Sequence, residues 1–371
     1  MSDAITVTRL LTRKNALDVS RIDTIAMPLP LQEGEVVLKV DRVAITTNNI
    51  TYAAFGDAMQ YWDFFPTGEP EWGHMPVWGF ADVVMSNAEG VEVGERFYGY
   101  YPLASHIRMK AVRVKKRGFY DGAEHRLTLV SAYNHYTRCS EDPAYRQPLE
   151  HYQMLLRPLF ITSFMGADFL QDNGFFGAQL VIVSSASSKT AYGTAFCLKE
   201  RDDIRLVGLT SRGNRDFVER LGCYHETAIY DEIRHLPVSQ PTLYLDFSGN
   251  EELRAAVHHH FGESLVYDCF AGSAQNTRFL RDVALPGPKP QFYFAPVQIR
   301  KRNSEWGHDE VNRRFNEAQR RFIDRVSDAR HPWMHIAEGE GYAHAQKLIR
   351  NMHDGWIDPL HGHVVVLDQP D

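Results

Sequence analysis

The sequence predicts a protein of two domains, a β-rich domain at the N-terminus followed by an α/β domain with a doubly wound parallel sheet. In the first 115 residues, short alternating segments are punctuated by Gly and Pro, which is typical of a small barrel or sandwich. From residue 178 onward, continuous apolar runs alternate with helical segments, which indicates βαβ units and a parallel sheet. The 371 residues are also too many for one ordinary core.

Alternating apolar and polar residues predict the strands of the first domain. Residues 36–45 read as a half-buried strand, residues 76–86 follow the same pattern, and residues 90–116 read as a turn followed by strands. Residues 56–76 have no period but contain five large aromatic side chains, so we predict an ordered functional loop. Residues 117–149 are polar and irregular, and we expect a connection there.

The second domain begins with apolar residues at helical spacing between Tyr152 and Leu170, in a segment that Pro158 is expected to kink or split. A buried strand at 180–183, a helix from 189, a second strand at 204–211 and a helix closed by Gly222 follow. Further strands are predicted at 226–233, 241–249, 264–272 and 291–297, a long charged helix at 308–326, and a helix, turn and strand in the tail.

Composition excludes several classes of protein. The net charge of −7 gives no electrostatic reason to expect nucleic acid or an anionic membrane as a partner. The N-terminus lacks the apolar core of a signal peptide, and no apolar run approaches the roughly 20 residues of a membrane span. The four cysteines are far apart and form no CxxC pair, so we expect a reduced, cytoplasmic protein.

Several segments, in order, resemble the medium-chain dehydrogenase/reductase superfamily. They are "GEVVLKVDRVAITTNNITYAAFGD", "PVWGFADVV", "VEVGERFYGY", "LVIVSSASSKTAYGTAFCLK", the stretch from "LVGLTSRGN" to "AIYDE", and "PTLYLDFSGN". The resemblance implies a GroES-like β-barrel catalytic domain over residues 1–148 and a Rossmann-type nucleotide-binding domain over 149–330. It implies that residues 331–371 return to complete the catalytic domain, and that the protein forms a homodimer.

The chain departs from the zinc-dependent members of that superfamily. Those members place a cysteine after the first barrel strand and a "GHE" motif in the next segment, where this chain reads "AITTNNITY" and "PVWGFADVV". Without those ligands we expect no metal, and the resemblance narrows to the zinc-independent quinone- and enoyl-reductase branch. His74 is a lone loop histidine, and the consecutive residues His258–His260 would point in different directions on a helix. We therefore expect none of these histidines to bind a metal.

The predicted phosphate-binding turn, "SSASSKTA", contains no glycine. The glycines of the superfamily fall on Ser185, Ser188 and Ala191, and serine and alanine are the next-smallest replacements. A helix N-terminus attracts anions, and hydroxyl and ammonium groups there would add donors for a phosphate. The predicted cofactor-binding residues of this turn are Ser185, Ser187, Ser188, Lys189 and Thr190. The alternative is an ordinary turn with a serine N-cap and a solvated lysine.

The end of the second strand favours NADPH over NADH. Sites specific for NAD usually place an acidic residue there, whereas this chain has Ser211 and Arg212, with Arg215 one turn later. A guanidinium pairs with a 2′-phosphate, although Ser211 and Arg212 could instead cap a helix and face water. Gly249 and Gly272 end later strands and are expected to face the cofactor.

Tyr52 is the candidate proton donor. It falls on the loop tyrosine of the quinone-reductase branch, and a phenol can donate to a developing enolate. Asn48 and Asn49 could orient the substrate or the cofactor amide, while Trp62 and Phe65 could wall an apolar substrate pocket. The alternative for Tyr52 is a packing role at the rim of the barrel.

The resemblance and these residues together predict a zinc-independent, NADPH-dependent reductase of an activated double bond or carbonyl. Its substrate would be a small apolar carbonyl compound such as an enone, a quinone or an enoyl thioester. Two alternatives stay open: a non-catalytic descendant of the fold that binds a ligand or nucleotide, and a hydratase or isomerase whose nucleotide is structural.

Overall fold

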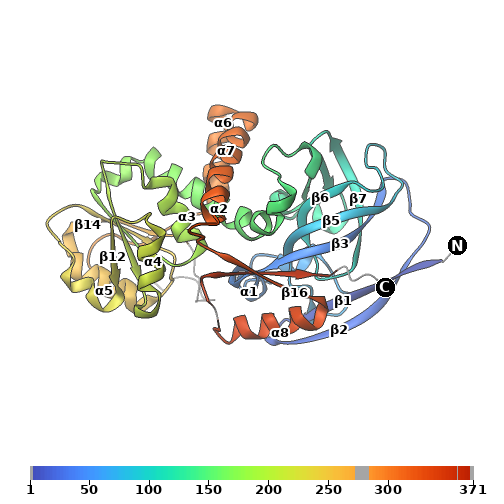
Figure 1. Ribbon diagram of the computed structural model, residues 1–371, viewed down its shortest axis with the longest axis horizontal. Helices are drawn as coiled ribbons and strands as arrows, with labels where there is room; N and C mark the ends of the chain where they lie inside the picture. Colours follow the sequence, from blue (N-terminus) through green and yellow to red (C-terminus); the bar gives the residue numbers. More distant parts are fainter. Residues whose placement is uncertain (1–2, 272–283, 357, 368–371) are drawn as a thin grey trace. The chain divides into compact units, whose positions relative to one another are not determined.

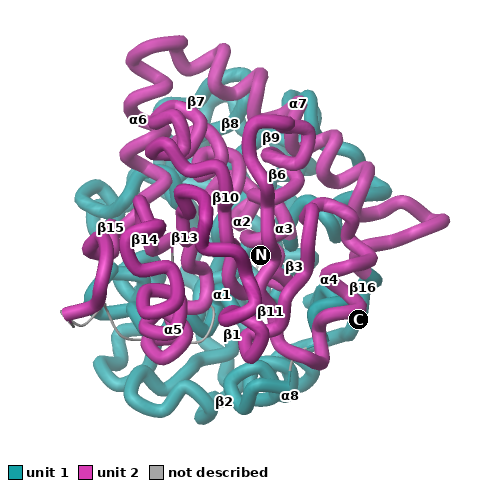
Figure 2. The backbone as a smooth tube through the Cα atoms, turned by 90° about the vertical axis from the view of Figure 1, so that its left-hand side faces the viewer, with its two compact units in different colours: residues 1–155, 335–371 teal, residues 156–334 magenta. Residues whose placement is uncertain are grey.

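The structure is a computed structural model that describes residues 3–271, 284–356 and 358–367. Two compact units make up the chain (Figure 2). The first contains residues 1–155 and 335–371, and the second contains residues 156–334. The C-terminal segment therefore returns to the unit in which the chain begins.

A closed six-stranded barrel forms the centre of the first unit. Its strands are β3 (Glu35–Ile45), β5 (Val77–Ser86), β6 (Arg96–Tyr101), β9 (His135–Arg138), β8 (Gly118–Asp121) and β7 (His106–Lys115). Each pairs antiparallel with the next in that order, and a β3–β7 pairing closes the ring. Closure leaves these strands no unpaired edge. The predicted GroES-like barrel is confirmed.

The prediction of a plain connection over 117–149 is wrong, because that stretch supplies two of the barrel strands. Both β8 and β9 have only four residues, which is too short for alternation to stand out in a polar sequence. Short 3-10 turns surround them: η2 (Glu124–Arg126), η3 (Ser131–Tyr133), η4 (Cys139–Glu141) and η5 (Gln147–Leu149).

Further elements lie outside the barrel (Figure 1). A three-stranded sheet contains β1 (Ala4–Arg13), β2 (Ala16–Pro28) and β4 (Trp72–Gly73). Helix α1 (Thr47–Ala54) follows β3, and the turn η1 (Tyr61–Phe64) lies in the aromatic loop, which is ordered as predicted. The C-terminal elements are β16 (His335–Glu340), α8 (Gly341–His353) and β17 (His361–Val366), and β17 pairs antiparallel with β3.

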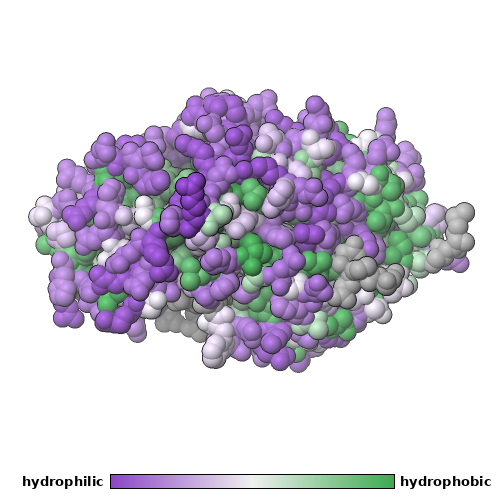
Figure 3. Space-filling view, in the orientation of Figure 1, coloured by the Kyte–Doolittle hydropathy of each residue, from purple (hydrophilic) through white to green (hydrophobic). Residues whose placement is uncertain are grey.

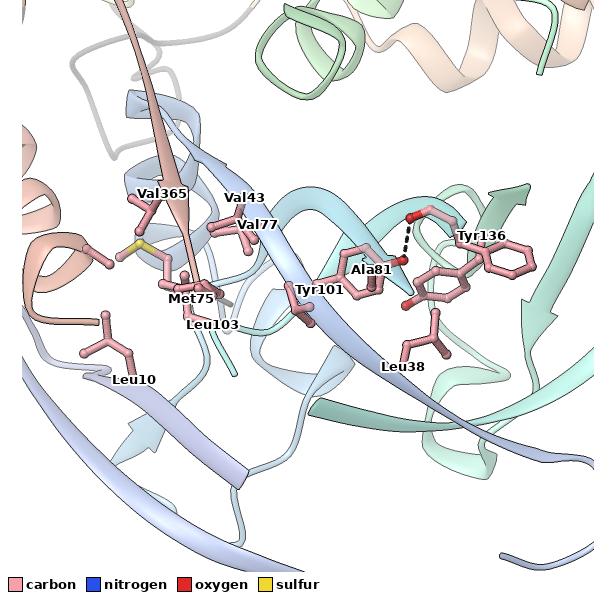
Figure 4. Close-up of a cluster of buried hydrophobic side chains, with 14 of the residues drawn as sticks. Leu10, Leu38, Val43, Met75, Val77, Ala81, Tyr101, Leu103, Tyr136 and Val365 are labelled. Carbon is pink, nitrogen blue, oxygen red and sulfur yellow. Dashed lines mark hydrogen bonds between the residues drawn. The ribbon is translucent and has the colours of Figure 1, made fainter. Parts of the chain in front are cut away.

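The core of this unit draws on segments from both ends of the sequence. Figure 4 shows Leu10 of β1 and Val365 of β17 in one cluster with side chains of the barrel such as Leu38, Val43 and Val77. The apolar face of α8 adds Ala345, Leu348, Ile349 and Met352. Burial of this apolar surface is what holds the C-terminal return against the barrel.

The second unit contains a six-stranded parallel sheet. Its order is β12 (Glu226–Ile229), β11 (Arg205–Thr210), β10 (Leu180–Val183), β13 (Thr242–Asp246), β14 (Leu265–Phe270) and β15 (Gln291–Phe292). Numbered along the chain this is 3-2-1-4-5-6, the order of a dinucleotide-binding sheet, and it reverses between β10 and β13. The predicted Rossmann-type domain is confirmed.

Helices precede, connect and follow the strands of this sheet along the chain; those at 150–172, 189–198, 215–221 and 308–326 lie close to the predicted positions, whereas those at 251–261 and 295–306 were not predicted. They are α2 (Glu150–Asp172), α3 (Lys189–Leu198), α4 (Arg215–Leu221), α5 (Glu251–Phe261), α6 (Ala295–Trp306) and α7 (His308–Val326). Shorter 3-10 turns are η6 (Gly174–Gly177), η7 (Arg212–Asn214), η8 (Tyr230–His235) and η9 (Gly262–Ser264).

Pro158 lies inside a continuous helix, and one predicted strand is much shorter than expected. Pro158 does not split α2, because the missing N–H costs one hydrogen bond in a helix of 23 residues whose apolar face is buried. The strand predicted over 291–297 ends after two residues, because Pro296 lies in the first turn of α6, where its fixed φ suits a helix start.

The described helices are each too short or too polar to span a bilayer. Hydrophilic residues cover most of the face drawn in Figure 3, where apolar residues form separate patches.

Candidate functional site

The turn between β10 and α3 adopts a conformation that usually requires glycine. Ser185 has a φ of 47°, in the left-handed region, which costs a residue with a Cβ about 1–2 kcal/mol. The resemblance predicts the first superfamily glycine at this position. Ser188 is the N-cap of α3, and its hydroxyl accepts a hydrogen bond from the Ala191 amide at 3.3 Å. The backbone therefore follows the course of a glycine turn although the residue is serine.

Hydrogen bonds on both sides hold this turn. The buried hydroxyl of Ser184 donates to Asp246 Oδ1 at 2.8 Å and accepts from the Phe247 and Ser248 amides at 2.9 and 3.1 Å. The Ala186 carbonyl accepts from the Tyr224 hydroxyl at 3.0 Å. These contacts offset the unfavourable φ of the residue between them.

The turn after β11 directly contacts the turn between β10 and α3, residues 184–188, which we call the serine turn. Asn214 Nδ2 donates to the Ser187 hydroxyl at 3.1 Å. Of the two predicted arginines, Arg215 pairs with Glu219 and Glu232, at 2.9 and 3.3 Å. The side chain of Arg212 is 78% exposed and has one long contact with Asp231, at 3.5 Å. Arg212 is thus the better placed of the two to receive an anion.

A pocket of about 240 Å³ opens at the carboxyl ends of β12 and β13, beside the start of α5. Its walls are Tyr230, Asp231, Ile233, Ser248, Asn250, Glu252, Leu253 and Ala256. Tyr230 is hydrogen-bonded to Ser185, and burial raises the pKa of its phenol. Two wall residues thus connect the pocket to the neighbouring turns: Tyr230 contacts Ser185, and Asp231 contacts Arg212. Ligands of doubly wound folds bind at this edge of the sheet, near the reversal of strand order.

Of the pocket walls, sequence reasoning found Asn250, which follows Gly249 at the end of its strand, and missed the others, although Tyr230 directly follows the β12 strand and could have been found by that position. The other predicted cofactor residues are distributed around the same edge. Lys189 and Thr190 are the first two residues of α3, and Gly249 follows β13 with a φ of 63°. Gly272 lies outside the described residues.

In the first unit, Tyr52 lies in a cluster of aromatic rings. It is 6% exposed, and its neighbours are Tyr61, Phe64, Phe65, Trp78, Tyr100 and Tyr133. Its hydroxyl accepts from Trp78 Nε1 at 3.3 Å and is hydrogen-bonded to Asn48 and Tyr133. Burial raises the pKa of Tyr52 far above its usual value, so the phenol is protonated at neutral pH and can act as an acid but not as a base.

The other predicted residues of this unit divide between two environments. Asn48 is hydrogen-bonded to Tyr52, and Phe65 packs in the same ring cluster, whereas Asn49 and Trp62 lie elsewhere in the unit. The Asn49 amide accepts from the Thr46 amide and donates to the Pro76 carbonyl, both at 2.7 Å, so it fixes the start of α1. Trp62 is 3% exposed and packs in the barrel core. The sequence did not distinguish these environments, because all of these residues lie within one short segment.

A buried arginine supports the ring cluster. Arg126 is 1% exposed, pairs with Asp121 at 2.7 Å and donates to the Tyr133 carbonyl at 3.0 Å. Its guanidinium also lies 5.3 and 5.0 Å from the ring centres of Phe64 and Phe65. Arg126 and Tyr133 fall in the stretch that was expected to be a plain connection, so no sequence signal pointed to them.

Within the described residues, no group of three or more His, Cys, Asp or Glu side chains is arranged to hold a metal ion. His258–His260 do diverge on α5, as predicted. Among the three, His258 is completely buried.

Comparisons with known proteins agree with this architecture. The model of a family described as "Protein of unknown function (DUF2855)" matches residues 43–358, while a comparison with curated proteins returns no match.

Solved structures with the same fold include CurA from Vibrio vulnificus in complex with NADPH, with a TM-score of 0.59 and 14% identity. The yhdH oxidoreductase from Salmonella enterica in complex with NADP has a TM-score of 0.56 and 14% identity. The Etr1p complex with NADP and crotonyl-CoA has a TM-score of 0.56 and 11% identity. In each case the match covers 98% of this chain and 100% of the other. The predicted combination of a GroES-like barrel and a Rossmann-type domain is thus also the fold of these structures.

Proposed function

The chain belongs to the DUF2855 family, and we propose that it is a zinc-independent, NADPH-dependent reductase of an activated double bond or carbonyl. The observation that carries this proposal is the edge of the parallel sheet in the second unit. There the left-handed Ser185 precedes the N-terminus of α3, and its hydrogen-bond partner Tyr230 lines a small pocket. The NADPH and NADP complexes of CurA and the yhdH oxidoreductase support it.

The residues at this edge fit the parts of a dinucleotide. The N-terminus of α3, with the serine turn, suits a pyrophosphate, because amide groups and positive partial charge gather there. The pocket is smaller than the roughly 300–1,000 Å³ sites of whole drug-sized ligands, so it suits a single ring system such as adenine. The exposed guanidinium of Arg212 would pair with the 2′-phosphate that distinguishes NADPH from NADH.

On the substrate side, NADPH supplies a hydride when bound, and the protein must supply a proton. Tyr52 is the proposed donor, because its phenol is protonated and is oriented by Asn48, Trp78 and Tyr133. The surrounding rings favour an apolar substrate, such as an enone, a quinone or an enoyl thioester. The crotonyl-CoA complex of Etr1p is consistent with the last of these.

Two measurements test the proposal. NADPH should quench intrinsic tryptophan fluorescence with a dissociation constant in the micromolar range, and absorbance at 340 nm should fall when an enone, quinone or enoyl thioester is added. Tyr52→Phe should lower kcat by about 100-fold and leave NADPH binding unchanged, because a general acid contributes roughly 10²–10⁴-fold. Absence of NADPH binding at millimolar concentration would overturn the proposal.

A second candidate is a protein of the same fold that binds the nucleotide without catalysis. The burial of Tyr52 favours it, because this side chain is only 6% exposed and its hydroxyl already has protein partners. Tight NADPH binding with constant absorbance at 340 nm across the substrate panel would identify this case. If a substrate were converted while that absorbance stayed constant, the protein would be a hydratase or isomerase with a structural nucleotide.

A further inference from the structure

Four ionisable side chains form a buried cluster in the second unit. Asp246 ends β13, Arg254 and His258 lie one turn apart on α5, and Asp268 lies in β14. Each is at most 4% exposed. We call them the buried quartet. Charged groups are buried at a high cost in free energy unless they are paired, so a cluster of four calls for a reason.

Asp246 connects the quartet to the two turns of the proposed nucleotide site. Its Oδ1 accepts from the Ser184 hydroxyl at 2.8 Å, from the amide and hydroxyl of Ser248 at 2.8 and 2.7 Å, and from the Gly249 amide at 3.1 Å. Its Oδ2 pairs with Arg254 Nη2 at 2.5 Å. One carboxylate therefore joins the turn after β10 to the turn after β13.

The other two members share a proton. His258 Nδ1 lies 2.7 Å from the Pro286 carbonyl oxygen, which can only accept, so Nδ1 carries a hydrogen. His258 Nε2 lies 2.8 Å from Asp268 Oδ2, and a hydrogen bond at that distance requires a second proton between the two atoms. The pair is then neutral overall, whichever atom holds that proton.

This proton balances the charge of the quartet. Arg254 offsets Asp246, and the protonated His258–Asp268 pair adds no net charge. Loss of the proton would leave a second unbalanced carboxylate 3.6 Å from Arg254 Nε, competing with Asp246 for the guanidinium. The ionisable neighbours on the same two strands, Tyr244 on β13 and Cys269 on β14, are buried groups whose raised pKa keeps them neutral.

We infer that the buried quartet is a positioning device for the dinucleotide, which holds the serine turn in the geometry that glycine otherwise provides. This inference rests on the proposed function. Ser184 and Asp246 fix the backbone on one side of the left-handed Ser185, and the protonated His258–Asp268 pair leaves Arg254 paired with Asp246. Asp246 and Arg254 act through the turn and need not contact the nucleotide themselves.

Two isosteric variants separate positioning from general stability. Asp246→Asn removes the charge that pairs with Arg254 and should raise the dissociation constant of NADPH at least 10-fold. Asp268→Asn keeps a donor toward His258 Nε2 and a neutral pair, and should change that constant by no more than about threefold at pH 7. The matched control is Asp168→Asn, which removes the charge of a partly buried carboxylate that pairs with another arginine of the same unit, Arg302. It should lower stability without changing NADPH affinity.

Hydrogen exchange in the absence of ligand tests the network independently of NADPH. Asp246→Asn should speed amide exchange in residues 184–191 and 247–250 about 10-fold, while Asp268→Asn and the control leave it within about twofold. If Asp246→Asn does not fold, Ser184→Ala interrupts the same connection at the turn and should give the same pattern.

The outcomes distinguish the two proposals. Wild-type protein that fails to bind NADPH would end the proposed function, and the exchange data would still decide whether the quartet holds the turn. Wild-type protein that binds NADPH, together with an Asp246→Asn variant of unchanged affinity and exchange, would overturn the positioning role. An Asp268→Asn variant as impaired as Asp246→Asn would show that the pair does not hold the proton.

Discussion

The two candidate regions of this protein are fixed by different forces. In the second unit, the serine turn is held by hydrogen bonds that end on buried charges, with Asp246 at their centre. In the first unit, Tyr52 is held by packing among aromatic rings, which the buried ion pair of Arg126 and Asp121 supports. Hydrogen bonds fix a backbone conformation, whereas ring packing fixes the environment of one side chain. The proposed function needs both, because a phosphate is bound largely by the backbone and a proton is donated by a side chain.

The largest loss of stability is expected at the buried ion pair that supports the ring cluster. Arg126→Leu leaves Asp121 buried without its partner and should lower the free energy of unfolding by about 3–5 kcal/mol. Urea unfolding followed by tryptophan fluorescence measures this. Arg313→Ala, at an exposed arginine with two glutamate neighbours, is the control and should change stability by less than about 1 kcal/mol. Similar losses in both variants would mean that the cluster is held by ring packing alone.

Acid should destabilise the first unit through His74. Burial, followed by the nearby charge of Arg9, lowers the pKa of this histidine to about 3, whereas an unfolded histidine titrates near 6.5. The unfolded chain therefore binds the proton first, so the contribution of His74 is present above pH 6.5 and is lost as the pH falls toward 3.

The expected loss attributable to His74 is about 2 kcal/mol between pH 8 and pH 5. His74→Leu should remove that dependence, and thermal unfolding of both proteins across this range measures it. His353→Asn, at an exposed histidine, should leave the pH dependence as in the wild type. If the stability of His74→Leu depended on pH as that of the wild type does, protonation of His74 would not be the cause of the loss in acid.

A smaller effect is expected at the edge of the nucleotide site. Arg212→Ala should weaken NADPH binding about 10-fold, or about 1.4 kcal/mol, and NADH binding by less than twofold, because the guanidinium is proposed to pair with the 2′-phosphate, which NADH lacks. Arg215→Ala should change either affinity less, since its guanidinium already pairs with Glu219 and Glu232. Isothermal titration with both nucleotides measures this difference. Equal losses for NADPH and NADH would remove the reason for preferring NADPH.

The sequence predicted the fold and the position of both candidate regions along the chain better than it predicted which residues contact one another within them. Continuous apolar runs and helical periods located β10, α3 and the serine turn, because buried parallel strands leave a strong pattern. The same reasoning missed Tyr133 and Arg126, which lie between two four-residue strands with no period. It also missed the buried quartet. Asp246, Arg254 and Asp268 look like ordinary charged residues in sequence, and only the fold brings them together.

The smallest change in stability is expected at Ser185, where the strain of the left-handed backbone can be weighed against the hydrogen bond of the hydroxyl. Ser185→Gly relieves the left-handed strain, worth about 1–2 kcal/mol, but it also loses the hydrogen bond with Tyr230 and frees the unfolded chain. These terms nearly cancel, so stability should change by less than about 1 kcal/mol and NADPH should bind within about threefold of the wild type. Ser185→Ala keeps the strain without the hydroxyl and should be the less stable of the two. A Ser185→Gly variant that loses NADPH binding would mean that the serine hydroxyl itself binds the ligand, and that the turn is more than a glycine turn held in place by its neighbours.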